Sequence, residues 1–306
     1  MRFGRWCFCE AGEAVRADKA VSGCVGGWVG SSIGSSVGVS VGPPVRRSAG
    51  PLRMIQFQNV HKSFGPKTVL DGFSLSIPDR ETTVVIGYSG SGKSVALKHI
   101  VGLILPDSGQ VEVDGQAVDR LDPDGLKDLR RKVGYVFQFA ALFDSMTVAE
   151  NIALGLARRG LSEGKIDRRI SDSLALVDLP DTQTRYPAEL SGGMRKRVGI
   201  ARAIALQPRY ILYDEPTSGL DPVTSAVIDE LMVRTRKELG VTGVVVTHDM
   251  RSAYTVGDRI AMLYQGKVRQ EGTIAEIQAT GDPIVRQFIE GRPREAAPDS
   301  GATVGA

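Results

Sequence analysis

The chain has 306 residues and a formal net charge of +3, but residues 1–53 hold seven of its 38 basic and three of its 35 acidic side chains. The remainder therefore carries 31 basic and 32 acidic residues, a net charge of −1, which excludes nucleic-acid binding through a broadly basic surface. All three cysteines (Cys7, Cys9 and Cys24) also lie in residues 1–53, which excludes a disulfide framework or a thiolate metal site in the remainder.

Residues 1–53 differ in composition from the rest of the chain. Residues 21–45 carry no charge and repeat glycine at every fourth position. This spacing resembles the small-residue face of a membrane helix, but the segment is dominated by Gly and Ser and ends in Pro43 and Pro44. We therefore predict a low-complexity, disordered tail. Met54 opens a regular strand pattern and is a candidate for the true start.

The first ordered segment has the pattern of a small antiparallel sheet. Residues 55–60 alternate apolar and polar side chains, as a half-buried strand does. Residues 69–77 and 109–118 predict further short strands. The pairs Asp71–Gly72 and Asp114–Gly115 are turn signals within them.

A phosphate-binding loop is predicted at residues 87–94, Gly-Tyr-Ser-Gly-Ser-Gly-Lys-Ser. The segment fits G-x-x-x-x-G-K-[ST], follows a β-branched strand at residues 82–86, and precedes a helix predicted over residues 95–103. Strand, glycine loop and helix together direct backbone N–H groups at phosphate oxygens. Lys93 would reach the β- and γ-phosphates and Ser94 would contribute a hydroxyl to Mg²⁺.

Strands alternate with helices again in the second half. Residues 132–138 resume a strand, and residues 147–190 are mostly helical. A strand at 210–213, a helix at 222–239 and a strand at 241–247 then predict a largely parallel sheet covered on both faces. Residues 292–306 are polar with Pro, Gly and Ala, and we predict a flexible tail.

A second group of candidate catalytic and metal-binding residues follows the helical stretch. The segment Leu-Ser-Gly-Gly-Met at residues 190–194 precedes a helix predicted over residues 195–205. Asp214 and Glu215 end the next strand, and His248 follows another. Asp214 could hold Mg²⁺ through water while Glu215 polarises the attacking water, and His248 could sense the γ-phosphate.

In this order the motifs resemble those of ABC-transporter nucleotide-binding subunits. The matching segments are residues 87–94 (Walker A), Gln138 (Q-loop), 190–194 (signature), 210–215 (Walker B), 218–221 (D-loop) and His248 (switch histidine). The resemblance implies an α/β P-loop NTPase domain over residues 54–291. Its parts would be a RecA-like parallel sheet core, an antiparallel β subdomain and an α-helical subdomain.

The resemblance also implies ATP and Mg²⁺, bound in a head-to-tail dimer. The residues implied for ATP are Phe64, Gly87, Tyr88, Ser89, Gly90, Ser91, Gly92, Lys93, Ser94 and Val95 of one subunit, with Ser191, Gly192, Gly193 and Asp221 of a second copy. The implied metal ligands are Ser94, Gln138 and Asp214. The implied catalytic groups are Glu215, His248, Lys93 and Gln138.

Several residues allow a structural interpretation beside the functional one. Phe64 either stacks on adenine or is a core aromatic residue at a strand end. Residues 139–143 are either core or the groove that receives a membrane partner. Residues 195–197, Arg-Lys-Arg, are interpreted as a solvated helix face. His61 and His99 belong to no motif and are interpreted as structural or exposed.

A finer resemblance concerns the cargo. Met194 with the basic run that follows it, residues 139–143 and residues 282–291 are similar to the ATPases of Mla/Mce lipid-transport systems. This implies phospholipid or related lipid cargo, a separate permease, an Mce-domain lipid carrier and a STAS-domain protein. It also implies a peripheral position on the cytoplasmic face of the inner or plasma membrane.

Three other functions compete with lipid transport. An importer ATPase for another small solute, such as an amino acid or a metal, shares every motif. A soluble ABC ATPase of translation or DNA repair is disfavoured, because the chain has neither a second such domain nor a long coiled-coil insertion. A signalling GTPase is disfavoured because the guanine-reading Asn-Lys-x-Asp motif is missing.

Overall fold

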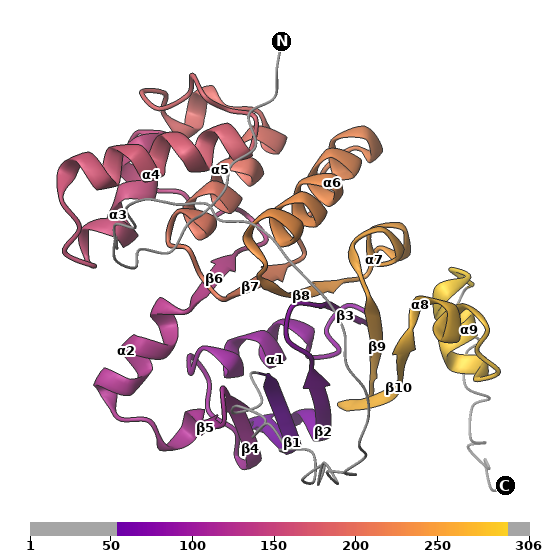
Figure 1. The fold of residues 1–306 in the computed structure, drawn as a ribbon. Coiled ribbons are helices and arrows are strands. Elements are labelled where there is room, and N and C mark those ends of the chain that lie inside the picture. The colour runs from indigo at the N-terminus through magenta and orange to yellow at the C-terminus, as the bar shows by residue number, and fades with distance from the viewer. Residues whose placement is uncertain (1–53, 293–306) are drawn as a thin grey trace, which may run out of the picture. The chain divides into compact units, whose positions relative to one another are not determined.

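Two β-sheets form the centre of the part of the chain that the structure describes, residues 54–292 of a computed structural model (Figure 1). The tail predicted over residues 1–53 lies outside that range, and so does the tail predicted over residues 292–306 apart from Arg292. The strands are β1 Ile55–Phe64, β2 Lys67–Ile77, β3 Thr82–Ile86, β4 Ser108–Val113, β5 Gln116–Ala117, β6 Val133–Val136, β7 Tyr210–Asp214, β8 Thr242–Thr247, β9 Arg259–Tyr264 and β10 Lys267–Thr273.

The two sheets differ in strand direction. The smaller, in the order β2-β1-β4-β5, is antiparallel. The larger has the order β10-β9-β3-β8-β7-β6 and is parallel except at its β10 edge. The predicted α/β architecture, with a parallel core and a separate antiparallel sheet, is confirmed.

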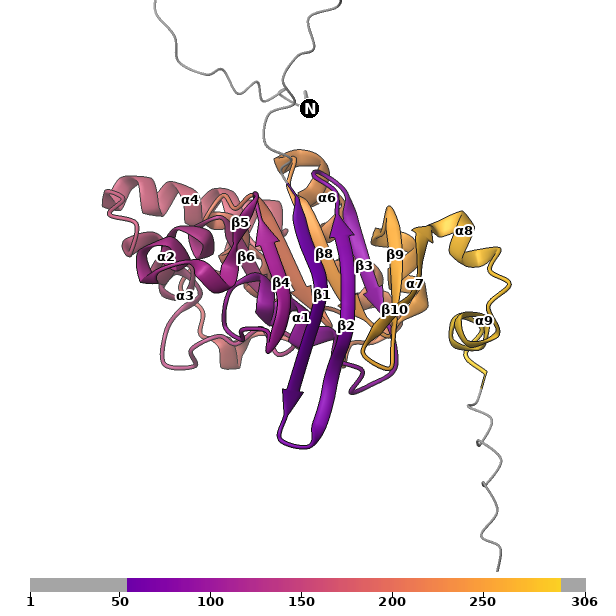
Figure 2. The same ribbon diagram turned by 90° about the horizontal axis from the view of Figure 1, so that it is seen from below.

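Within residues 54–292, helices pack against both sheets. The α-helices are α1 Lys93–Ile100, α2 Pro123–Arg131, α3 Val148–Ala157, α4 Glu163–Leu176, α5 Gly192–Ala205, α6 Pro222–Leu239, α7 Met250–Val256, α8 Ile274–Gln278 and α9 Pro283–Ile289. Short 3-10 turns occur at η1 Val118–Arg120 and η2 Pro187–Glu189. The helices α3, α4 and α5 form a helical group of their own, and α1 lies between the two sheets (Figures 1 and 2).

Alternate residues of each central strand enter different hydrophobic cores. Val84 and Ile86 of β3 pack in the core shared with α3 to α7, whereas Val85 packs in the core shared with α1 and the antiparallel sheet. The same alternation holds in β7, where Ile211 and Leu212 enter opposite cores. Burial on both faces explains why these strands are continuous apolar runs.

One of the two predicted turns is wrong. Asp71 pairs with His61 and Phe73 pairs with Val60, so Gly72 is an unpaired extra residue of β2 and forms a bulge. The Asp-Gly pair does not end the strand because both flanks continue to pair with β1. The other signal, Asp114–Gly115, does form the turn between β4 and β5, with positive φ at both residues.

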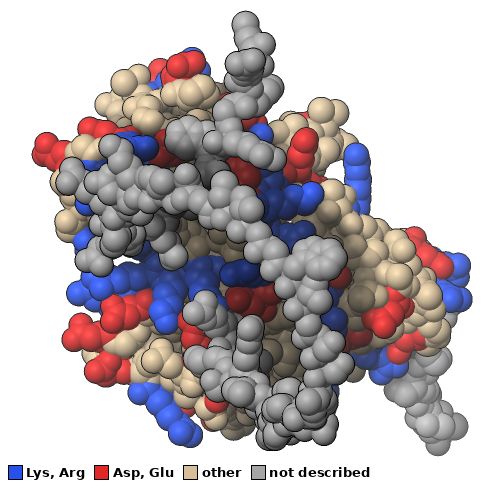
Figure 3. All heavy atoms as spheres, viewed as in Figure 1, with Lys and Arg blue, Asp and Glu red and all other residues tan. Residues whose placement is uncertain are grey.

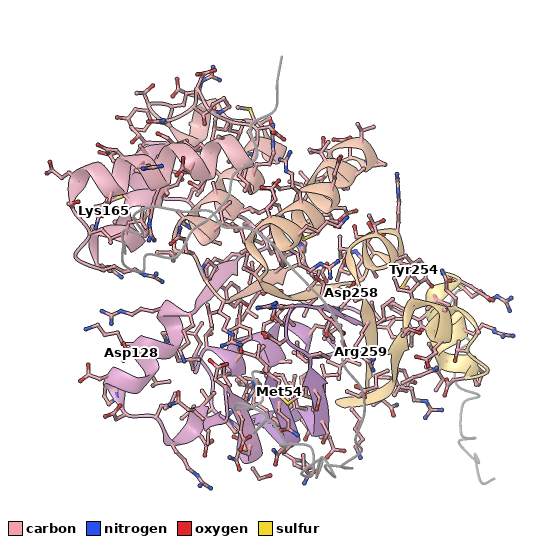
Figure 4. All side chains as sticks on the ribbon, in the orientation of Figure 1. Met54, Asp128, Lys165, Tyr254, Asp258 and Arg259 are labelled. Carbon is pink, nitrogen blue, oxygen red and sulfur yellow. The ribbon has the colours of Figure 1, made fainter. Side chains whose placement is uncertain are left out.

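Several charged side chains connect secondary-structure elements through hydrogen bonds. Asp258, between α7 and β9 (Figure 4), accepts hydrogen bonds from the Thr82 amide at 2.7 Å and from Arg236 of α6. Figure 3 shows basic side chains gathered between α2 and the helical group. Arg159, just after α3, donates to the backbone carbonyls of Arg131 and Leu206, which ties the end of α3 to the ends of α2 and α5.

Within residues 54–292, no helix is long and apolar enough to cross a membrane.

Asn151 of α3 organises the segment that follows β6. It is fully buried, and its side-chain nitrogen donates to the carbonyls of Phe143, Met146 and Thr147 at 2.9–3.1 Å. Its side-chain oxygen accepts from the Phe143 amide at 2.8 Å. One amide therefore satisfies four backbone groups of a loop that has no regular structure of its own.

We expect Asn151→Ala to lower the free energy of unfolding by about 2–4 kcal/mol, because it leaves the Phe143 amide and the Met146 carbonyl without their partner and a cavity in place of a buried side chain. Urea denaturation measures this. The matched control is Gln183→Ala, which removes a single surface amide hydrogen bond to Ser171 and should cost about 0.5 kcal/mol or less. Equal losses in the two variants would show that Asn151 does not hold the loop.

Candidate functional site

The predicted phosphate loop joins β3 to α1. Gly92 adopts φ +106° as the N-cap of α1, and a Cβ there would lie 2.9 Å from Val69 Cγ1. Only glycine fits both the dihedral angle and the space. Gly92 therefore turns the chain directly into α1, whose first backbone N–H groups begin at the glycine loop, as at an anion site.

Lys93 lies inside this loop. Its side chain is 6% exposed, and its Nζ donates to the carbonyls of Gly87 at 2.8 Å and Tyr88 at 3.1 Å. Burial lowers the pKa of Lys93, and the nearby charge of Glu215 opposes that shift. The ammonium group is thus held at the loop centre by weak neutral acceptors, which an incoming phosphate oxygen can replace.

Asp214 and Glu215 stand at the carboxyl end of β7, beside the loop. Ser94 Oγ donates to Asp214 Oδ1 at 2.6 Å. Glu215 Oε1 lies 3.7 Å from Lys93 Nζ, and Glu215 Oε2 lies 2.8 Å from His248 Nδ1. The structure therefore brings together five of the predicted site residues, which come from three different strand ends.

Tyr135 is a site residue that the sequence did not indicate. It lies on β6, and its hydroxyl donates to Asp214 Oδ2 at 3.1 Å. Burial, and then the charge of Asp214, raise the pKa of Tyr135, so the phenol keeps its proton and remains a donor. With Ser94 on the other oxygen, both oxygens of Asp214 are oriented. No motif surrounds Tyr135, and only the pairing of β6 with β7 reveals its role.

Gln138 contacts the loop that follows β7. Its side-chain nitrogen donates to Ser218 Oγ at 3.3 Å, in the loop after β7. This contact joins the segment after β6 to the segment after Glu215. Its predicted role as a metal and water ligand stays a prediction.

Phe64 ends β1 and is 48% exposed as a residue, so it is not a core aromatic residue. The ammonium group of Lys62 lies 5.6 Å from its ring centroid. An exposed aromatic face is available for stacking, and contact with adenine stays a prediction.

The residues predicted to act from a second copy lie at helix starts. Ser191 caps α5 by accepting from the Met194 amide at 3.2 Å, and Asp221 caps α6 with 3.0 Å bonds from the amides of Val223 and Thr224. Among the described residues, Ser191, Gly192, Gly193 and Asp221 make no hydrogen bond or ion pair with the phosphate loop or with Glu215. Their functional role is therefore not completed inside one chain.

The interpretation of residues 195–197 as a solvated face is wrong for Lys196. Arg195 is exposed, but Lys196 is 7% exposed and donates to the backbone carbonyls of Gln138 and Glu215. Position 196 faces the sheet one turn into α5. A basic residue between two others gave no indication that its side chain points inward.

A hollow of about 660 Å³ adjoins the site on the side of His248. It is lined by residues of the loop after β7, the starts of α6 and α7, and the end of α9. The phosphate loop does not line it. Phe288 of α9 lines the hollow and also contacts the phosphate loop, because its ring meets the Tyr88 ring edge to face with 4.9 Å between the ring centroids.

Comparison with known proteins places these features in one family. The family model described as ABC transporter matches residues 70–218. The methionine import ATP-binding protein MetN 2 of Pseudomonas entomophila is 42% identical over 243 residues, covering 78% of this chain and 72% of that protein. The corresponding MetN of Carboxydothermus hydrogenoformans is 41% identical over 240 residues, covering 77% and 71%.

Solved structures agree on the fold. The ATP-binding cassette MJ0796, in a dimeric post-hydrolysis state bound to ADP and Pi, has a TM-score of 0.67 and 36% identity over 72% of this chain and 99% of that one. The cbiO1 protein of Clostridium perfringens, part of the transporter complex cbiONQ, has a TM-score of 0.69 and 28% identity over 76% and 93%.

These relatives correct one expectation. The likeness to Mla/Mce lipid-transport ATPases is wrong, because the relatives at 37–42% identity are named as methionine importers. The Mce-domain and STAS-domain partners expected from that likeness lose their support with it. The broader likeness stands: this chain belongs to the ABC transporter family of ATP-binding subunits and is an ATPase.

Proposed function

We propose that this chain powers an importer for a small solute, with methionine as the first candidate. The carrying observation is the contact of Glu215 with both Lys93 and His248 beside the phosphate loop, which suits ATP hydrolysis. The methionine importers among its relatives support the direction of transport and the cargo class.

Each site residue has a task in attack of water on the γ-phosphate. Lys93 leaves the carbonyls of Gly87 and Tyr88 and binds phosphate oxygens, while the N-terminus of α1 adds its amide groups. Glu215 orients the water and accepts its proton. His248, held 2.8 Å from Glu215, lies where it can bind the γ-phosphate as charge develops.

The residues around Asp214 fit a magnesium ion. Ser94 and Asp214 present hydroxyl and carboxylate oxygens, the ligands Mg²⁺ prefers, and Tyr135 keeps the carboxylate oriented. Among the described residues, no group of three or more His, Cys, Asp or Glu could enclose a metal ion by itself. Mg²⁺ bound with phosphate oxygens and water, as in other nucleotide sites, would neutralise phosphate charge.

A second copy of the chain completes the site in this proposal. Ser191, Gly192 and Gly193 open α5 with a hydroxyl and amide groups suited to an anion, yet they do not contact their own phosphate loop. A head-to-tail dimer would place them, with Asp221, over the ATP of the other copy. The dimeric state of the MJ0796 cassette supports this arrangement.

The segment after β6 is the proposed contact for a membrane permease. Phe139 is 85% exposed and Phe143 is 55% exposed, so their alternative interpretation as core is wrong. Large apolar side chains exposed together mark an interaction surface. Through this contact the chain would lie at the cytoplasmic face of the membrane without entering it.

We expect Glu215→Gln to lower kcat for ATP hydrolysis by about 100-fold or more while ATP affinity stays within about threefold, because the carboxamide cannot accept a proton. Phosphate release and nucleotide binding measure the two effects, and size-exclusion chromatography should show an ATP-bound dimer. Glu230→Gln, at an exposed position of α6, is the control. Turnover near wild type in Glu215→Gln would remove Glu215 from the mechanism.

Lys93→Ala should weaken ATP binding by about 30-fold or more, equivalent to about 2 kcal/mol, through loss of a charge-assisted contact to phosphate. Equilibrium binding of a fluorescent ATP analogue checks this. Lys98→Ala, in the last turn of the same helix, should leave affinity unchanged. Equal affinities for the two variants would contradict the proposed place of the phosphates.

The cargo is tested by uptake in cells that normally carry this chain. Deleting its gene should abolish high-affinity uptake of labelled methionine, the wild-type gene should restore it, and the Glu215→Gln gene should not. Uptake of an unrelated sugar is the control. Unchanged methionine uptake, or a permease that copurifies with lipid instead, would overturn the cargo while leaving the ATPase activity intact.

A further inference from the structure

The ammonium group of Lys196 joins three separate parts of the protein. The side chain leaves α5, in the helical group, and its Nζ donates to the carbonyl of Gln138, just after β6. The same Nζ lies 3.4 Å from the carbonyl of Glu215, just after β7. These partners are 58 and 19 residues away in the sequence.

A buried lysine needs such partners. Lys196 is 7% exposed, and an ammonium group removed from water costs free energy unless acceptors replace the water. Two carbonyl oxygens and the negative charge of Glu215 provide that replacement. Both carbonyls must therefore stay beside the Lys196 ammonium group, since moving either one away leaves a buried charge poorly solvated.

Both carbonyls belong to segments with a proposed task. Glu215 has φ +48°, an uncommon angle for a residue with a side chain, and its amide donates to the Val246 carbonyl at 3.0 Å. Lys196 contacts the carbonyl group of the same residue. Gln138 immediately precedes Phe139, the most exposed aromatic residue of the proposed permease contact.

The neighbouring arginines show how Lys196 differs. Arg197 also donates to two backbone carbonyls, those of Val177 and Asp178, each at 3.2 Å. Both lie just after α4, within the helical group. Arg195 donates to the carbonyl of Leu190, the residue before the N-cap of its own helix. Of the three basic residues, Lys196 is the one that reaches both Gln138 and Glu215.

We propose that Lys196 is a positioning residue that links the segment after Gln138 to the orientation of the Glu215 carboxylate. A shift of that segment, or of α5, would move Nζ and with it the peptide group of Glu215. The inference rests on the proposed role of Glu215 in hydrolysis and adds a residue that acts through the Glu215 backbone.

The test compares Lys196→Met with Arg197→Met in the full-length chain. Each change replaces a basic side chain of α5 with an unbranched apolar one and removes two contacts to carbonyls. We expect Lys196→Met to lower kcat by about tenfold or more with the dissociation constant for ATP within about threefold of wild type. Arg197→Met should keep kcat within about twofold, even if its melting temperature falls.

A second variant guards against misfolding. Lys196→Gln keeps an uncharged N–H donor on a side chain that is one bond shorter, and it should recover part of the lost kcat relative to Lys196→Met. If Lys196→Met does not fold, the same limits on kcat and ATP affinity apply to Lys196→Gln, with an expected loss of about threefold or more.

Two results would overturn the inference. One is a wild-type kcat in the Lys196 variants alongside a strong loss in Glu215→Gln, which would leave the proposed function standing. The other is parallel loss of kcat, ATP affinity and melting temperature in Lys196→Met and Arg197→Met, which would show a merely structural role. Near-normal turnover in Glu215→Gln would instead overturn the proposed function itself.

Discussion

Everything at the candidate site depends on the parallel register of three buried strands. Ile86 at the end of β3 pairs with Thr247 of β8, and Asp214 of β7 pairs with Val246 of β8. The residues that follow these strand ends must therefore emerge side by side at one edge of the sheet. Because each strand is buried on both faces, a slip in register would disturb two cores at once. The phosphate loop and Glu215 are neighbours for that reason.

The helix α1 and the helical group of α3, α4 and α5 are attached to this sheet in different ways. The helix α1 is enclosed between two sheets, so the phosphate loop has little freedom. The helical group shares a hydrophobic core with one face of the sheet, and side chains such as Asn151 and Lys196 add hydrogen bonds that hold irregular backbone beside that core. These few hydrogen bonds can change with less cost than the packed core beside them. This division separates a stable binding scaffold from parts able to respond to a partner.

Much of this arrangement was predictable from the sequence, because apolar runs and glycine spacing report directly on strands and loops. The helix at Pro222–Leu239 was located to the residue, since Asp221 caps it and Gly240 ends it. Lys196 and Tyr135 could not be found in this way: whether a polar side chain points inward depends on what packs against it. The cargo assignment failed for a related reason, because it depended on a few residues such as Met194 that do not touch a cargo.

The backbone conformation of Glu215 affects whether activity or the folded structure is lost first in denaturant. A non-glycine residue at φ +48° stores roughly 1 kcal/mol or more of strain, which its neighbours must balance. The acid is therefore held by the surrounding network against its own conformational preference. Mild denaturant that loosens the hydrogen bonds around Glu215 would release this residue first, while the two hydrophobic cores keep the sheet folded. The enzyme is then expected to become inactive while still globular, so the site is more fragile than the fold that carries it.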